Sequence, residues 1–218
     1  MERKQVAVVL SGCGVYDGSE IHEAVLTLLA IDQQGAAYQC FAPDIIQHHV
    51  INHLTGEASD EVRNVLVESA RLARGNIEPL SKFDADAFEA IIFPGGFGAA
   101  KNLSSFAFEG ADCSVDGGVA SAVKAMLDRG KPIGALCIAP AVMAKILPGA
   151  KVTIGADAAT AAAIEAMGGK HQRSGHGEVV VDEANNLVTS PCYMLEATVG
   201  QIAEDAAKTV AEVLSRTR

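Results

Sequence analysis

The chain has 218 residues, of which 49% are hydrophobic, and these values suit one large domain with a substantial core. Its 27 acidic residues outnumber 17 basic ones and give a formal net charge of −10, which disfavours binding to nucleic acid or to anionic membranes. The five cysteines include no Cys-x-x-Cys pair, so we expect free thiols in a reducing compartment rather than disulfides or a structural zinc.

The first residues contain neither a transmembrane span nor a signal-peptide cleavage site. We therefore expect a cytoplasmic protein, with residues 1–218 in a single domain. Its partner is expected to be a small molecule, with no metal and no cofactor.

The first 35 residues predict a strand, a loop and a helix. Residues 5–10 are almost wholly apolar, as in a strand covered on both faces. A turn-rich segment over residues 11–19 precedes a helix that begins near Glu20 and ends at Gly35. The periodicity of this helix predicts one buried apolar stripe, formed by Ile21, Ala24, Val25, Leu28 and Leu29.

The next segment predicts a second strand over residues 38–42 and a helix over residues 60–74. Between them lies an irregular stretch that carries His48, His49 and His53. No cysteine or carboxylate motif accompanies these histidines, so a solvated loop is favoured over a metal site.

A third strand is predicted over residues 88–93, and it ends in a turn that contains Gly95 and Gly96. Glycines at a strand end leave backbone N–H groups free to approach a ligand closely, because no Cβ is in the way. Residues 103–116 have no clear period and predict a loop, and residues 119–129 predict a helix.

Residues 131–141 form the most informative stretch of the chain. A short apolar segment ends at Cys137, and small residues then lead into a helix. This pattern is typical of a nucleophile elbow, where a reactive side chain occupies a strained corner ahead of a helix start. A helix N-terminus there is expected to lower the pKa of the thiol. The alternative interpretation of Cys137 is a packed, unreactive core cysteine.

The rest of the chain predicts further alternating elements. These are a strand at 151–154, a helix at 158–167, a hairpin from 179–181 and 187–189, and a last helix at 196–215. Alternating strands and helices predict an α/β fold with a mainly parallel sheet and helices on both faces. Ligands bind such sheets at the carboxyl ends of the strands, so the segments 11–23, 95–102 and 137–140 are expected to converge.

Glu23 has two interpretations at this point. It lies off the apolar stripe of its helix, which favours a surface position. The first turn of that helix also begins at the expected ligand edge, where a carboxyl group could exchange a proton with a thiol. Among the other cysteines, Cys13 lies in the first loop, and Cys40, Cys113 and Cys192 have no comparable surroundings.

Residues 10–24, 51–57, 94–103 and 137–140 together resemble the ElbB family, whose members are described as isoprenoid biosynthesis proteins with an amidotransferase-like domain. The family is part of the PfpI and Parkinson-associated protein superfamily. The resemblance covers essentially the whole chain. It implies a flavodoxin-like three-layer sandwich of the class I glutamine amidotransferase type, usually a homodimer. By position it assigns the catalytic roles to Cys137 and Glu23, and oxyanion binding to Gly95, Gly96 and the amide of Ile138.

The chain departs from the superfamily pattern after the strand that follows the elbow helix. Many members have a histidine there, whereas this chain has residues 151–155 without one, and neither His171 nor His176 has a spacing that makes it a substitute. Acyl transfer to a thiolate normally uses a histidine base, so a protease or glutaminase is disfavoured.

The resemblance implies a cofactor-independent glyoxalase that converts glyoxal to glycolate through a hemithioacetal on Cys137. The alternative is a non-enzymatic, redox-sensing or ligand-binding dimer in which Cys137 oxidises to a sulfinic acid. An amidotransferase-type hydrolase is a third interpretation.

Overall fold

A seven-stranded sheet runs through the centre of the molecule in the spatial order β10-β11-β7-β6-β1-β2-β5. The computed structural model describes residues 3–217. In the same order, the strands span Val180–Asp182, Leu187–Ser190, Ile133–Leu136, Ala90–Phe93, Gln5–Val9, Ala37–Ala42 and Ile77–Pro79. Neighbouring strands pair in parallel, except that β10 and β11 form an antiparallel hairpin at one edge. The predicted mainly parallel α/β architecture is confirmed.

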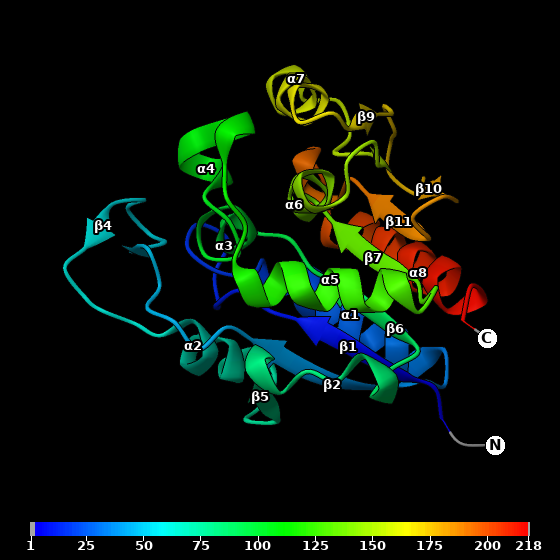
Figure 1. Cartoon of the computed structure of the whole chain (residues 1–218). Helices are drawn as coiled ribbons and strands as arrows, with labels where there is room; N and C mark the ends of the chain where they lie inside the picture. The colour runs from blue at the N-terminus through cyan, green and yellow to red at the C-terminus, as the bar shows by residue number, and fades with distance from the viewer. Residues whose placement is uncertain (1–2, 218) are drawn as a thin grey trace.

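Helices cover both faces of this sheet (Figure 1). One face packs against α1 (Ile21–Gln33), α2 (Val65–Leu72) and α8 (Val199–Ser215), and the other against α5 (Gly117–Asp128) and α6 (Ala139–Ile146). Side chains alternate along β1, so that Val6 and Val8 belong to the first core while Ala7 and Val9 belong to the second. The result is the three-layer sandwich that was expected.

Shorter elements gather near the carboxyl ends of the central strands. These are α3 (Phe97–Lys101), α4 (Phe106–Glu109) and α7 (Ala158–Ala166). Figure 1 shows α3, α4 and α6 on the side to which the arrowhead of β7 points. In that region the sequence predicted only a glycine turn and a loop over residues 94–116, because helices of four or five residues are too short to show a period.

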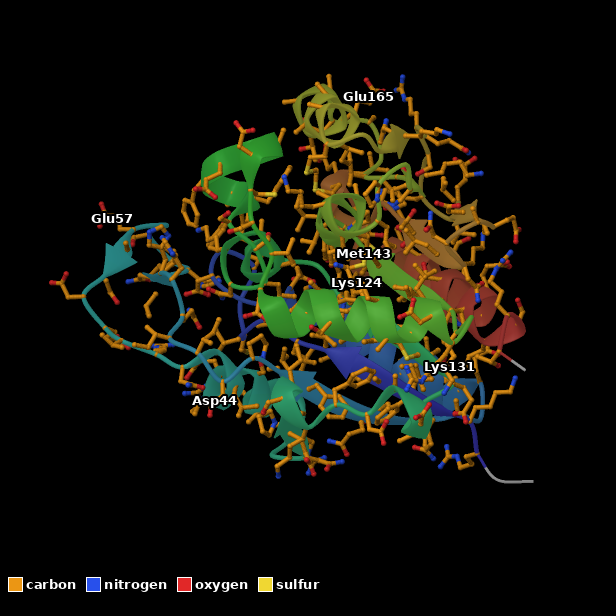
Figure 2. All side chains as sticks on the ribbon, in the orientation of Figure 1. Asp44, Glu57, Lys124, Lys131, Met143 and Glu165 are labelled. Atoms are coloured by element: carbon orange, nitrogen blue, oxygen red, sulfur yellow. The ribbon has the colours of Figure 1, made fainter. Side chains whose placement is uncertain are left out.

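A long excursion leaves the sheet after β2. It contains the small hairpin of β3 (Val50–Ile51) and β4 (Ala58–Ser59), and Figure 2 shows Glu57 at its outer end. The helix predicted over residues 60–74 begins only at Val65, because the Asn64 side chain caps the backbone N–H of Val67. A second small ribbon pairs β8 (Lys151–Val152) with β9 (Lys170–His171) outside the main sheet.

The predicted buried stripe of α1 is partly wrong. Ile21, Val25 and Leu29 are 44%, 45% and 45% exposed, whereas Glu23 and Thr27 are 0% exposed. The helix is therefore rotated relative to the prediction. Glu23 and Thr27 are buried where α1 packs against neighbouring elements such as α8. The hydrophobic pattern of a single helix does not show which neighbours will cover its polar positions.

No helix among residues 3–217 has both the length and the apolar character required to cross a membrane.

Candidate active site

Cys137 occupies the corner between β7 and α6. Its φ angle is +61°, a left-handed conformation that is uncommon for a residue other than glycine. Its N–H donates to the carbonyl of Ser190 at 3.0 Å, which ties the corner to the neighbouring strand β11. Ile138 follows as the N-cap of α6, and Pro140 lies in the first turn, where its missing N–H costs no hydrogen bond. Backbone strain held by surrounding structure is typical of functional corners.

Glu23 reaches this corner from the first turn of α1. Its carboxylate Oε2 accepts the Gly95 N–H at 2.9 Å, and Oε1 accepts the Tyr193 N–H at 3.2 Å. Oε2 and the Cys137 sulfur both lie against Gly95, and the nearby Glu23 raises the pKa of the thiol. The structure therefore buries Glu23 beside Cys137, and the surface position that the helix period favoured is wrong.

Gly95 is required at its position by close approach rather than by its φ angle. A Cβ atom at residue 95 would lie 2.7 Å from Glu23 Oε2 and 2.9 Å from Cys137 Sγ. Any side chain would thus separate the carboxyl group from the sulfur. Gly95 also differs from its expected role, because its N–H donates to Glu23 and is not free to bind an oxyanion.

The other two expected amides face the sulfur. Backbone N–H groups of Gly96 and Ile138 point to Cys137 Sγ and oppose the rise of its pKa. Gly96 has φ +97°, and a Cβ there would lie 2.3 Å from the backbone nitrogen of Glu20, so only glycine fits. Preorganised backbone N–H groups beside a nucleophile are the kind of donor that can stabilise a developing oxyanion.

Burial dominates the electrostatics of the pair. Burial raises the pKa of Glu23 to about 8, helped by the nearby Glu20, while the N–H donors of Tyr193 and Gly95 oppose the rise. Burial, followed by the proximity of Glu23, also raises the pKa of the Cys137 thiol well above its ordinary value. The expected lowering of the thiol pKa by the helix start is therefore wrong, because desolvation outweighs the two amides.

A cavity of about 510 Å³ opens over Cys137. Its apolar wall comes from loops and short helices, through Val15, Phe97, Ala100, Phe106, Ala107, Ile138 and Met194. Its polar wall comes from Glu20, Asp157, Thr160 and Tyr193. Sequence reasoning did not select these polar residues, because they come from the start of α1, the start of α7 and the segment after β11, which meet only in the fold.

Histidines approach the site without lining this cavity, so far as residues 3–217 show. The imidazole Nδ1 of His22 lies 2.8 Å from the Tyr193 hydroxyl, behind the polar wall. The ring nitrogens of His176 contact the Asp205 carboxylate at 2.9 Å and the Glu196 carbonyl at 3.0 Å, so this ring is occupied elsewhere.

Comparison with known proteins identifies the family. The model of the DJ-1/PfpI family matches residues 76–196. The chain belongs to the DJ-1/PfpI family. This superfamily includes enzymes.

Two curated members of this family are similar to almost the whole chain. The ES1 protein homolog, mitochondrial, of Rattus norvegicus is 48% identical over 99% of this chain and 85% of its own length. The human glutamine amidotransferase-like class 1 domain-containing protein 3, mitochondrial, is 48% identical over 98% of this chain and 83% of its own length. The names of these relatives place them in mitochondria, and this finding contradicts the cytoplasmic location expected from the sequence.

Two solved structures share the fold of this chain. The isoprenoid biosynthesis protein with amidotransferase-like domain from Ehrlichia chaffeensis superposes with a TM-score of 0.91 at 35% identity, covering 98% of this chain and 99% of that one. Drosophila melanogaster DJ-1beta shares the fold at 17% identity, with a TM-score of 0.56 and coverage of 99% of this chain and 96% of that one. The flavodoxin-like, class I glutamine amidotransferase-like fold is thereby confirmed.

Proposed function

We propose that this DJ-1/PfpI protein is an ElbB-type, cofactor-independent glyoxalase that hydrates and isomerises glyoxal to glycolate. The observation that carries the proposal is the burial of the Glu23 carboxyl group close to the Cys137 sulfur, where both lie against Gly95. The amides of Gly96 and Ile138 oppose the rise in the pKa of this thiol. The resemblance of the whole chain to the ElbB family supplies the reaction, and the cavity supplies room for a small aldehyde.

The reaction begins with proton transfer within the pair. In its ionised form Glu23 takes the thiol proton of Cys137, and the sulfur attacks one aldehyde carbon to form a C–S bond. The amides of Gly96 and Ile138 hold the oxygen that becomes negative. Protonation of that oxygen gives a neutral hemithioacetal.

Glu23 then moves a second proton. It removes the hydrogen from the carbon bonded to sulfur and returns a proton to the neighbouring carbon, so that one carbon is oxidised and the other reduced. The product is a thioester of glycolate. Water breaks its C–S bond, releases the acid and restores the thiol, and the balance is one glyoxal plus one water for each glycolic acid.

The test measures glycolate by NMR, because proteins consume glyoxal without turnover through their lysines and arginines. We expect multiple turnovers with the wild type and none with Cys137→Ala. Cys40→Ala is the matched control, because it removes a buried thiol from β2, in the sheet outside the cavity. Equal glycolate production by wild type and Cys137→Ala would exclude the cysteine mechanism, and no production by either would exclude the glyoxalase.

Treatment with mild peroxide, followed by mass spectrometry of the cysteine peptides, distinguishes the redox-sensing alternative from the glyoxalase. A sensor requires Cys137 to oxidise far faster than Cys40, a buried thiol whose pKa burial raises to about 12. The 7% exposure of Cys137 and its raised pKa disfavour rapid oxidation, because the thiolate is the form that peroxide oxidises.

We further propose that the chain forms a homodimer through the outer face of α1. Ile21, Val25 and Leu29 recur every four residues and are close to half exposed, so they form a continuous apolar stripe. Such a stripe is suited to a second copy of the same helix.

A further inference from the structure

The cavity over Cys137 is much larger than glyoxal needs. A two-carbon molecule leaves most of its roughly 510 Å³ unfilled, and this volume lies in the usual range for ligands of many heavy atoms. Phe97 and Phe106 contribute to an apolar wall that a substituent on the aldehyde would contact. The size and the aromatic lining thus favour a substituted 2-oxoaldehyde.

The charges around the cavity have one sign. Glu20 and Asp157 both line it, whereas no lysine or arginine is among its lining residues in the part of the chain that the structure describes. The ionisable groups at its base are Glu23 and Cys137, which become negative when they lose protons. An anionic substituent would therefore meet two carboxylates and no cation among these lining residues. The nearby Lys101 ammonium, 5.3 Å from the centroid of the Phe97 ring, donates to the Tyr16 carbonyl.

Both carboxylates are held in place by helix starts. Glu20 Oε2 accepts the Glu23 N–H at 2.8 Å, and Oε1 lies 3.9 Å from His22 Nδ1. Asp157 Oδ1 accepts the Thr160 N–H at 2.7 Å at the start of α7, and this contact lowers the pKa of Asp157. Two fixed negative charges, from the starts of two different helices, thus line the same cavity as Cys137.

We propose that this cavity selects uncharged or cationic aldehydes with an apolar substituent and rejects anionic ones, with Glu20 and Asp157 as the residues that determine the selection. The substrate class named here rests on the glyoxalase function proposed above. The rejection of anions by the cavity is independent of that function, since it concerns any small molecule that approaches Cys137.

The first experiment therefore measures selection without turnover. Cys137 is alkylated with neutral iodoacetamide and anionic iodoacetate, the rates are followed by mass spectrometry of its peptide, and their ratio is divided by the ratio for a small uncharged thiol. We expect a preference for iodoacetamide of about tenfold, the size of effect that two partly screened charges produce. A normalised ratio near one overturns the proposal.

Variants assign the effect to its residues. Asp157→Asn keeps a side-chain acceptor for the helix start and removes the charge, so we expect the preference to fall about threefold. Glu20→Gln should act in the same direction. Glu165→Gln removes the same charge from the outer part of the same helix α7, away from the cavity (Figure 2), and should leave the ratio as in the wild type. An equal fall in Glu165→Gln and Asp157→Asn would overturn the assignment.

The second experiment tests the substrate class. The kcat/KM for 2-oxopentanal is compared with that for 4,5-dioxopentanoate, which carries the same 2-oxoaldehyde and an added carboxylate. We expect the neutral compound to be favoured about tenfold, with the ratio reduced in Asp157→Asn. Glyoxal is measured alongside them, and alkylation selectivity without turnover of any of the three aldehydes would remove the glyoxalase and leave the charge selection standing. Turnover of both substituted aldehydes at equal kcat/KM would keep the glyoxalase and overturn the charge selection.

Discussion

The two faces of α1 differ from those of an ordinary amphipathic helix. Its inner face buries Glu23 and Thr27 together with apolar residues such as Leu28 and Ile31, and its outer face exposes Ile21, Val25 and Leu29. Burying a carboxyl group costs free energy unless it stays protonated or gains partners, and Glu23 does both, with a raised pKa and two backbone donors. The orientation of α1 thus places a carboxyl group beside Cys137 and leaves three large apolar side chains exposed on the opposite face.

The largest expected effect is on the inner face. Glu23→Gln should lower kcat/KM for glyoxal by about 100-fold or more, because it removes the proton acceptor. The wild-type rate should rise through about pH 8 as Glu23 ionises, and that rise should be missing in the variant. Glu57→Gln is the control, since Glu57 lies at the outer end of the excursion (Figure 2). A wild-type rate that is flat from pH 6 to 9 would contradict the role of Glu23.

The same carboxyl group should make stability depend on pH. Its pKa is about 8 in the folded chain against an ordinary value of 4.5, so the unfolded chain ionises first as pH rises. Stability should be fully present below pH 4.5 and fall until about pH 8, by on the order of 3 to 5 kcal/mol.

Urea unfolding of wild type and Glu23→Gln at several pH values measures this term. The difference between the two curves isolates Glu23, because both chains share every other titrating group. The free energy of unfolding of the wild type should fall steadily relative to that of the variant between pH 4.5 and 8. Parallel curves would show that Glu23 ionises normally in the folded chain.

The outer face supplies the next prediction. Val25→Glu places a charge in the middle of the exposed stripe and should convert the proposed dimer to a monomer, as measured by light scattering after size-exclusion chromatography. Val62→Glu is the control, because Val62 is 76% exposed in the excursion, away from α1. A wild type that is monomeric at all concentrations would end the dimer proposal.

The smallest expected effect again concerns the inner face. The Thr27 hydroxyl is buried with no hydrogen-bond partner among the described residues. Thr27→Val keeps the shape and removes the desolvated hydroxyl, so it should stabilise the chain by about 1 kcal/mol in thermal or urea unfolding. Marked destabilisation would show that the hydroxyl has a partner of its own.

Local patterns were sufficient for the architecture and for one half of the site. Alternating apolar strands and periodic helices predict a parallel sheet, because each element must bury its own apolar residues. Cys137 could be selected from the sequence, since the change from an apolar strand to small residues and a helix is a property of adjacent positions. The hairpin of β10 and β11 followed from its turn for the same reason.

The surroundings of Cys137 depend on contacts between distant segments. Period alone placed Glu23 on the surface, whereas packing of α1 against α8 and the sheet buries it. The Gly95 amide, expected to bind an oxyanion, is taken by Glu23, because both lie at the same strand end. Desolvation raises the pKa of the thiol, and no local pattern reports the degree of burial. The position of Cys137 could therefore be predicted from adjacent residues. Its protonation state and its partners arise only when four segments meet at one edge of the sheet.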